Sequence, residues 1–501
     1  MKKIVIMIMI LTTVFLTGCI DKTTSENQLN SLSYYELIPS IILGSSQLNP
    51  NEYIREISLG GEHSALFTTD NRLFIWGNND RGQLGLQDIT SQLTPIEITE
   101  SLSLQNEEMI QSISLGQRHT GVFTSDNRIF VWGWNLYGHL GDGTRTSQSS
   151  PVEITNQFVF DAEEKIEEIE FGYTHSSLIT SLGKVYIWGN NSSAQLGNGT
   201  IDNSANPVNI TSFFTLDNEE KIVDISLGYV HSLALSSSGR LFAWGNNANG
   251  QIGDGTNELH TTPLDITGFL NLNTNEKIIK VSAGEFHSAA ITSQGRLFTW
   301  GKNNYGQIGN NSLNKQISPL DITNSFALNE NDIFSYLTLG DSYSMAVTES
   351  KRVYIWGSLT DGFVTPVETG DNYLIPHELT NEIELSPYEQ FISVSSGGEH
   401  TALITSKGRL LIWGMNQSGQ LGNGNKNGYL LPIDITQTVY VSHLIHSLDI
   451  IKETVIPTYL PELDKFIFDG WYTNDTLSSK WNDSLMPDND VSLYGTWHYL
   501  P

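Results

Sequence analysis

The chain has 501 residues, of which 55 are acidic and 26 basic, giving a formal net charge of −29 at neutral pH. That excess of negative charge repels phosphate backbones and therefore argues against nucleic-acid binding. The single cysteine, Cys19, excludes a disulfide framework and a cysteine-based zinc site, and the apolar content is sufficient for a core.

The N-terminal segment has the pattern of an export signal. Two lysines precede an apolar run over 4–16 that is short for a bilayer span and fits a signal-peptide core. The run ends in Leu16-Thr17-Gly18-Cys19, which resembles a bacterial lipobox. The resemblance implies cleavage after Gly18 and lipidation of Cys19. We therefore expect a lipoprotein signal peptide over 1–18, a flexible tether over 19–33, and anchoring on the extracellular face of the bacterial cell membrane. The alternative is an ordinary secretory signal with an incidental cysteine.

A repeat of about 56 residues follows. Seven Trp-Gly dipeptides recur at intervals of 56, with 57 in the last interval, and a histidine lies 13 residues before every tryptophan except the sixth, where Tyr343 replaces it. A period of this length indicates a propeller, solenoid or array. The residues that mark the repeat are Trp76, Trp132, Trp188, Trp244, Trp300, Trp356 and Trp413, with His63, His119, His175, His231, His287 and His400.

Each copy contains four short strand-like segments. In the fourth copy these are 222–228, 231–235, 240–245 and 263–267, rich in apolar residues and bounded by turn residues. Seven units of four strands predict an all-β fold with a seven-bladed β-propeller over 34–437, and a linear β-solenoid is the alternative. We expect each tryptophan to pack between blades, its glycine to allow a tight turn, and each histidine to bond backbone of its own or the next blade.

The repeat motif resembles a known family. Gly60-x-x-His63-Ser64 is followed by Trp76-Gly77-Asn78-Asn79 and Gly82-Gln83-Leu84-Gly85, and later copies repeat this order. It is similar to the repeat of the regulator-of-chromosome-condensation family, whose members fold as seven-bladed propellers. The founding members act as guanine-nucleotide exchange factors, and secreted bacterial members bind other proteins through loops on one face.

Prolines near the last strand of each copy provide a second marker. They lie 19 residues after the tryptophan, which predicts that each opens the last strand, and the spacing makes 37–42 around Pro39 an extra copy of that strand. In the sixth copy we expect the last strand at Thr365–Glu368. A longer loop would then follow, containing Tyr373, Pro376, His377, Pro387 and Tyr388; it is either ordinary drift or an edge reshaped for a partner.

Residues 438–501 break the 56-residue period. The segments Phe466–Asn474, Trp481-Asn482 and Met486–Trp497 resemble the second half of the internalin-type B repeat of bacterial surface proteins. The resemblance implies a small β-grasp-like module used as a spacer or adhesive unit.

Nothing in the sequence singles out a catalytic or metal site. The chain lacks the usual nucleophile, zinc-protease and phosphate-loop motifs, and histidines spread one to a blade lie too far apart to share a metal ion. We therefore expect no catalytic residues, no metal and no cofactor.

The variable positions of the repeat suggest where binding occurs. Two residues between the fixed glycine and histidine vary between copies, as do residues after Trp-Gly, and several are aromatic. Ordinary loop drift is the alternative explanation. The sequence thus predicts a lipid-anchored surface protein that binds an unknown protein or glycan; the alternatives are an extracellular hydrolase or lyase and a nucleotide-exchange-like activity. The candidate binding residues are Glu62, Arg118, Tyr173, Tyr229, Glu285, Phe286, Asp341, Glu399, Trp134, Tyr137 and Tyr305.

Overall fold

The computed structural model describes residues 52–358, 372–383 and 385–436, and in addition the backbone of short strands within 4–20 and 466–499. The chain divides into two compact units, residues 52–435 and residues 1–51 with 436–501.

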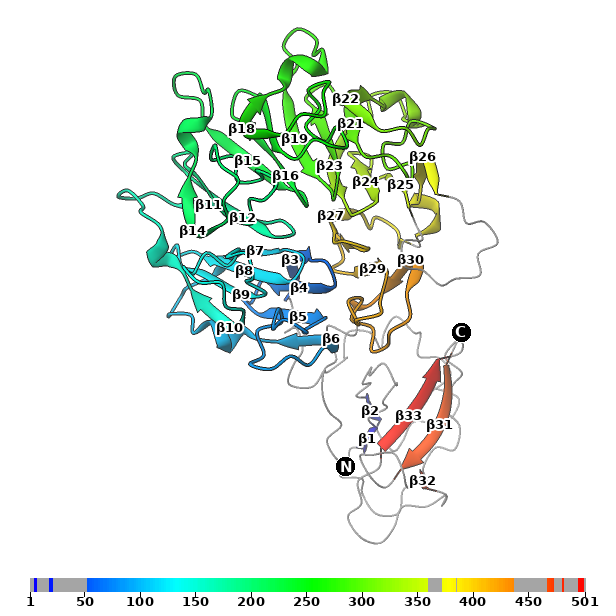
Figure 1. The fold of residues 1–501 in the computed structure, drawn as a ribbon. Coiled ribbons are helices and arrows are strands. Elements are labelled where there is room, and N and C mark those ends of the chain that lie inside the picture. Colours follow the sequence, from blue (N-terminus) through cyan, green and yellow to red (C-terminus); the bar gives the residue numbers. More distant parts are fainter. Residues whose placement is uncertain are drawn as a thin grey trace. The chain divides into compact units, whose positions relative to one another are not determined.

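The larger unit consists of seven four-stranded antiparallel sheets, each built from four consecutive strands that pair in chain order. The sheets are arranged as blades around a ring, with the first strand of each blade innermost (Figure 1). The predicted seven-bladed β-propeller is confirmed. Blades 1 to 3 contain β3 (Ile54–Leu59), β4 (His63–Thr68), β5 (Leu73–Gly77), β6 (Gln92–Glu97); β7 (Ile110–Leu115), β8 (His119–Thr124), β9 (Ile129–Gly133), β10 (Gln148–Glu153); β11 (Ile166–Phe171), β12 (His175–Thr180), β13 (Val185–Gly189), β14 (Ser204–Asn209).

Blades 4 to 7 repeat this arrangement, and short 3-10 helices follow the last strands of blades 1 to 6. The strands are β15 (Ile222–Leu227), β16 (His231–Ser236), β17 (Leu241–Gly245), β18 (His260–Asp265); β19 (Ile278–Ala283), β20 (His287–Thr292), β21 (Leu297–Gly301), β22 (Gln316–Asp321); β23 (Phe334–Leu339), β24 (Tyr343–Thr348), β25 (Val353–Gly357), β26 (Tyr373–Glu378); β27 (Phe391–Ser396), β28 (His400–Thr405), β29 (Leu410–Gly414), β30 (Tyr429–Asp434). The 3-10 helices are η2 (Thr99–Leu102), η3 (Thr155–Gln157), η4 (Thr211–Phe213), η5 (Thr267–Leu270), η6 (Thr323–Ser325) and η7 (Thr380–Glu382).

The core lies between blades rather than within them. Every residue of the second and third strands is buried, because both faces of these strands pack against neighbouring blades. One such layer joins Phe67 and Ile75 of blade 1 to Val122 and Trp132 of blade 2. This packing explains why these strands are continuous apolar runs instead of alternating patterns.

The Trp-Gly pair ties each blade to the preceding one. The indole Nε1 of Trp132 donates to the carbonyl oxygen of Gln83 at 2.9 Å. Gly133 adopts φ +106°, and a Cβ there would lie 2.6 Å from the carbonyl oxygen of Arg118. Only glycine fits this turn without strain.

The ring closes with the same contacts that join its other blades. Trp76 of blade 1 donates to the carbonyl oxygen of Gln420 of blade 7 at 2.8 Å, and the amide of Gly398 donates to the carbonyl of Gly60 at 3.1 Å. The innermost strands β27 and β3 are in contact. The predicted extra strand around Pro39 lies outside the described residues.

The last strands correct two expectations from the sequence. The prolines do not open these strands but occupy their fourth position, as Pro95 does in β6. In blade 6 the fourth position of β26 is Pro376, so the last strand is Tyr373–Glu378 and not the segment around Pro366. The prediction assigned Tyr373, Pro376 and His377 to a loop because Thr-Pro-Val-Glu resembles a last strand more closely than Leu-Ile-Pro-His does.

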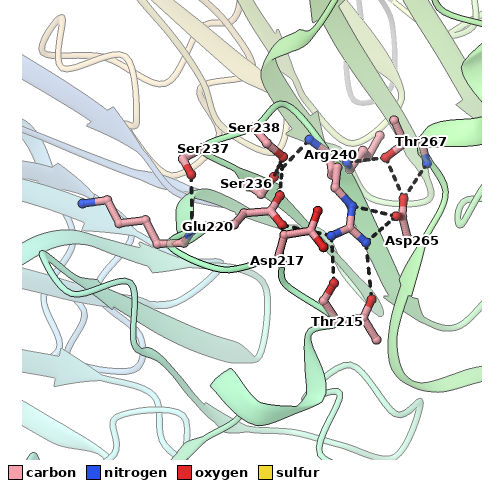
Figure 2. A network of polar contacts seen from close by, with 11 residues as sticks. Thr215, Asp217, Glu220, Ser236, Ser237, Ser238, Arg240, Asp265 and Thr267 are labelled. Carbon is pink, nitrogen blue, oxygen red and sulfur yellow. Dashed lines mark hydrogen bonds and ion pairs between the residues drawn. The ribbon is translucent and has the colours of Figure 1, made fainter.

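A buried ion-pair cluster fastens the outer part of each blade. In blade 4, Arg240 bonds Glu220 at 3.0 Å and Asp265 at 2.7 Å, and the Glu220 side chain is only 3% exposed (Figure 2). Burial alone would raise the pKa of Glu220, but hydrogen bonds from Ser236, Ser238, the Asp217 amide and Arg240 outweigh burial and lower it to about 2.

This ion-pair cluster, which we call the clamp, recurs with the 56-residue period and was not predicted from the sequence. A basic residue four positions before the tryptophan pairs with an acidic residue 20 positions earlier in five of the other blades. In blade 6, Asp332 takes the acidic position and bonds Ser350, while Arg352 pairs with Glu378. The buried acids are Glu52, Glu108, Glu164, Glu220, Glu276 and Glu389.

The described strands of the smaller unit form a two-stranded and a three-stranded sheet. The strands β1 (Ile4–Ile6) and β2 (Gly18–Ile20) pair antiparallel, with Val5 opposite Cys19. In the C-terminal segment, β31 (Phe466–Tyr472) lies between β32 (Lys480–Trp481) and β33 (Tyr494–Tyr499) in an antiparallel sheet. The described strands do not settle whether this sheet belongs to a β-grasp-like module, so that assignment stays a prediction.

Candidate binding surface

The variable loops of the repeat meet at one end of the central channel. The turn after the first strand and the loop after the third strand lie at the same end of each blade, because His63 pairs with Gly77 and its equivalents do likewise. Seven turns, at 60–62, 116–118, 172–174, 228–230, 284–286, 340–342 and 397–399, therefore surround one mouth of the channel. We call this end, including the loops after Trp-Gly, the loop face.

Three predicted aromatic residues form a continuous row on the loop face. The rings of Tyr173 and Tyr229 lie edge to face at 4.9 Å, and those of Tyr229 and Phe286 at 5.4 Å. The ammonium of Lys302 lies 4.8 Å from the centre of Phe286 and 5.8 Å from that of Tyr305. All four aromatic residues are partly exposed. We call Tyr173, Tyr229 and Phe286, with Tyr305 at the end, the aromatic arc; it spans blades 3 to 5.

Two further predicted aromatics form a separate cluster on blade 2. The rings of Trp134 and Tyr137 are 5.4 Å apart, and Trp134 lies 5.3 Å from the buried His139. His139 occupies the position of Gln83, Gln195 and their equivalents. Burial lowers the pKa of His139 to about 3, so its imidazole is neutral. The neutral ring packs against Trp134 as part of the aromatic cluster.

The predicted charged residues occupy the other sectors of the loop face. Glu62 accepts hydrogen bonds from Asn78 at 2.6 Å and Ser418 at 2.9 Å, so it joins blade 1 to blade 7. Arg118 pairs with Asp80 at 2.9 Å. Glu285 lies 3.5 Å from Lys302, next to the aromatic arc. Asp341 borders the channel cavity, and both it and Glu399 are partly exposed.

The repeated histidines lie inside the blade interfaces instead. The Nε2 atom of His175 is 2.9 Å from the Ser232 hydroxyl of the next blade, and that hydroxyl donates to the carbonyl oxygen of Gln195 at 2.9 Å. Because the serine proton is directed to the carbonyl, the imidazole donates through Nε2–H. Burial lowers the pKa of His175 to about 3 and keeps it neutral.

The same relay links five other pairs of blades, and blade 6 has a substitute. The acceptor is a side-chain hydroxyl of the next blade rather than the backbone expected from the sequence. Tyr343 donates to the carbonyl of His400 at 2.9 Å and accepts from Thr401 at 2.8 Å. The remaining relays pair His63 with Thr120, His119 with Ser176, His231 with Ser288, His287 with Ser344 and His400 with Ser64.

Behind the loop face, the innermost strands enclose a polar channel that the sequence had not revealed. Its cavity has a volume of about 360 Å³ and is lined by all seven blades. Each strand contributes two inward positions on the same face, two residues apart. The cavity is lined by the layer nearer the loop face, which consists of Ser58, Ser114, Glu170, Ser226, Ser282, Thr338 and Ser395, and by Lys280, Tyr336 and Ser393 of the next layer. The alternation of the strands places Glu56, Ser112, Glu168 and Asp224 at the other positions of that next layer.

Some channel residues satisfy the free backbone edges of the innermost strands. The carboxylate of Glu56 accepts from the Ile113 amide at 3.2 Å, and the hydroxyl of Ser58 accepts from the Leu115 amide at 3.1 Å. These strands have no neighbour in their own sheet on the channel side, so side chains of the preceding blade supply the acceptors.

Carboxyl groups are concentrated in blades 3 and 4. Burial, and then the charge of Asp224, raise the pKa of Glu170 to about 8. Burial likewise raises the pKa of Glu168 and Asp224, and the nearby carboxylates raise that of Lys280. Lys280 lies 3.7 Å from Asp224.

Within the described part of the chain, no group of three or more His, Cys, Asp or Glu side chains is arranged to hold a metal ion. Nor does any helix there have the length and apolarity needed to cross a bilayer. The repeated Asp-Gly-Thr and Asn-Gly-Thr segments form Asx turns, as where Asp142 accepts from the Thr144 amide at 2.9 Å.

Comparison with protein families identifies the repeat. A family model described as "RCC1-like domain" matches residues 101–447. Two models of the "Regulator of chromosome condensation (RCC1) repeat" match residues 70–123 and 54–83.

Curated relatives extend over most of the propeller. The Ultraviolet-B receptor UVR8 of Arabidopsis thaliana is 28% identical over 378 residues, which is 75% of this chain and 80% of the receptor. The mitochondrial RCC1 domain-containing protein RUG3 of the same plant is 30% identical over 364 residues, 70% of this chain and 76% of that protein. The human E3 ubiquitin-protein ligase HERC2 is 27% identical over 386 residues, but these are only 7% of the ligase.

Solved structures agree on the fold. Prp20p from Saccharomyces cerevisiae superposes with a TM-score of 0.61 and 22% identity, covering 78% of this chain and 90% of that one. Human WBSCR16 gives a TM-score of 0.59 and 22% identity, covering 73% and 93%. At this identity the likeness shows the fold alone.

Proposed function

We propose that this chain, which belongs to the RCC1-like domain family, is a binding protein without a catalytic role that presents its loop face to a protein partner. The observation that carries the proposal is the aromatic arc. Partly exposed aromatic rings in mutual contact are typical anchors of protein interfaces, because they bury large areas at a small cost in side-chain entropy.

Relatives with this fold support the proposal by their titles. One solved structure shows yeast RCC1 bound to Kap60, and another concerns the binding of Prp20p to Gsp1p and histones. UVR8 is named a receptor and HERC2 a ubiquitin ligase. The two titles thus name protein partners for a yeast propeller of this fold.

Affinity capture with matched variants tests the proposal. The test variant is Tyr173→Ala/Tyr229→Ala/Phe286→Ala on the loop face. The control, Val223→Ala/Ile279→Ala/Ile392→Ala, removes side chains that are 43%, 50% and 45% exposed near the opposite ends of innermost strands.

We expect the test variant to lose its partner and the control to retain it, with a loss of at least tenfold in affinity once the partner is purified. Equal retention by both variants would place the binding surface elsewhere. Capture of a glycan and no protein would correct the class of partner.

We also propose that the protein is held at the extracellular face of a bacterial membrane through a lipid on Cys19, with residues 19–33 as tether. The lipobox-like segment that ends at Cys19 supports this. Cys19→Ser should move the protein from the detergent phase to the aqueous phase in Triton X-114 partitioning. If the two forms partition alike, the anchor proposal is wrong.

The C-terminal segment 438–501 is proposed to be an internalin-type B-repeat-like module that acts as a spacer or adhesive unit. Its three described strands and its Phe-x-Gly-Trp-Tyr motif support this assignment.

A screen for enzymatic activity tests the catalytic alternatives. Turnover of a substrate in a broad hydrolase and lyase screen, or accelerated nucleotide release from a small GTPase, would replace the proposed binding role by one of these alternatives.

A further inference from the structure

Glu170 of blade 3 is a carboxyl group that the scaffold does not need, whereas Glu168 and Asp224 accept the backbone amides of Ile225 and Val281 in the next blade. In blades 1, 2 and 4 the layer nearer the loop face carries a serine whose hydroxyl accepts the backbone amide of the next blade. Glu170 holds this position in blade 3. Its hydrogen bond in the described part of the chain is instead with Ser114 of the preceding blade, at 3.3 Å. The scaffold role therefore does not account for its carboxyl group.

One built-in cation faces three carboxyl groups. Lys280 lies 3.7 Å from Asp224 and also interacts electrostatically with Glu168 and Glu170. Were all three ionised, the group would carry an excess of two negative charges in a partly enclosed space. Their mutual repulsion is relieved only by proton uptake or by a second cation.

The cavity also holds polar groups without a protein partner. Ser282 lines it, is 9% exposed, and its hydroxyl makes no hydrogen bond among the described residues. The hydroxyl of Tyr173, a residue that lines the same cavity, likewise makes no hydrogen bond among the described residues. Such groups are satisfied when a ligand with hydrogen-bond donors or acceptors, or ordered water, enters.

The cavity joins this cluster to the loop face. Tyr173, Glu285 and Asp341 belong to its lining, as do Glu170 and Lys280 deeper in. Its volume of about 360 Å³ lies at the lower end of the range for small-ligand sites and suits one long side chain or a small molecule. A cation approaching the mouth meets the aromatic arc first, where Lys302 already shows how an ammonium lies over Phe286.

We propose that the channel receives an alkylammonium or guanidinium group from a lysine or arginine side chain of the partner docked on the loop face, and holds it against Glu170, Glu168 and Asp224. The inference rests on the proposed function and names the chemistry that the partner must present. Its recognition element is the group of three carboxyl groups, which a bound cation keeps ionised, together with the unpartnered hydroxyl groups. A free polyamine shares this chemistry.

The probe for the site is N-acetyl-lysine-N-methylamide, with the neutral N-acetyl-norleucine-N-methylamide as ligand control and calcium chloride as metal control, titrated by NMR into the full chain. Two variants are expected to change the affinity for the lysine probe in opposite directions. Glu170→Ser installs the residue that five other blades carry at this position and should weaken binding of the lysine probe about tenfold. Lys280→Ser removes the competing cation and should tighten it about tenfold.

The control variant is Glu349→Ser, the same charge change at an exposed turn between β24 and β25. It should bind the lysine probe as the wild type does. If Lys280→Ser unfolds, Lys280→Gln replaces it in the same comparison. The proposal is overturned if the lysine probe binds no better than its norleucine counterpart, if Glu170→Ser behaves like Glu349→Ser, or if removing the Lys280 charge does not tighten binding. It is equally overturned if calcium binds and the lysine probe does not.

The two proposals fail separately. If the cation site is absent, the variant lacking the aromatic arc still loses its captured partner while Glu170→Ser keeps it. If the loop face is not the binding surface, the lysine probe still distinguishes Glu170→Ser from Lys280→Ser. In that second case the natural ligand is a free amine. Spermidine should then bind most tightly to Lys280→Ser, less tightly to the wild type and least tightly to Glu170→Ser.

Discussion

The buried glutamate of the clamp provides a quantitative test of the structure. The folded pKa of Glu220 is about 2, against an ordinary value of 4.5. Because folding lowers this pKa, the ionised carboxylate stabilises the fold fully above pH 4.5, and this stabilisation is lost as pH falls through 2. A difference of about 2.5 pKa units corresponds to about 3 kcal/mol at pH 7. The side chain is 3% exposed, so solvent screening reduces this figure little.

Glu220→Gln should therefore lower the unfolding free energy by about 3 kcal/mol at pH 7 and by only about 1 kcal/mol near pH 3, because at pH 3 the carboxyl group is already protonated in the unfolded wild-type chain. Urea unfolding followed by tryptophan fluorescence at both pH values measures the difference. The exposed neighbour Glu219, changed to Gln, should stay within about 0.5 kcal/mol of the wild type at either pH. An equal loss at pH 7 and pH 3 would refute the reasoning, because the effect would then be steric and not electrostatic.

Two further predictions concern the blade interfaces. Ser232→Ala leaves the buried Nε2–H of His175 without an acceptor and should cost about 1–3 kcal/mol in urea unfolding. Ser232→Thr should cost less than about 1 kcal/mol, since threonine fills this position in blades 2 and 7; equal losses would contradict the relay. Gly245→Ala should lower the thermal midpoint, at a cost of at least about 2 kcal/mol, because φ is +101° and the new Cβ would lie 2.6 Å from the Val230 carbonyl. An unchanged midpoint would mean that this turn can relax.

The sequence was sufficient for the architecture because a propeller repeats its constraints. Every blade carries the same tryptophan and glycine at the same place, and six of the seven carry the same histidine, so the 56-residue period reveals these residues and the blade count follows. The hydroxyl after each histidine and the clamp residues Glu220 and Arg240 carry the same period. The sequence prediction rests on the tryptophan, glycine, histidine and proline positions and does not include these residues, although their spacing follows the same period.

The channel, in contrast, could not be found by periodicity. Its deeper inward positions hold carboxylate, hydroxyl, ammonium and phenol groups in different blades, and the layer nearer the loop face repeats only small serine residues, which do not stand out in the sequence. In Ile-Glu-Glu-Ile-Glu-Phe of β11 the alternation shows that Glu168 and Glu170 share a face. Which face lines the channel depends on which strand of the blade is innermost. That assignment comes from packing between blades rather than from the pattern of one strand.

The separation between constant and variable positions supports the location of function at the channel mouth. Histidine, tryptophan and clamp residues are engaged in interfaces within the scaffold, and changing one of them perturbs two blades at once. The turn residues and the inward residues of the innermost strands make fewer contacts between blades and can therefore vary. Glu170, for example, stands where five other blades have serine. Because both variable sets converge on one mouth, a ligand that enters there contacts the arc and the carboxyl cluster together. Specificity can then change from protein to protein without altering the ring that positions it.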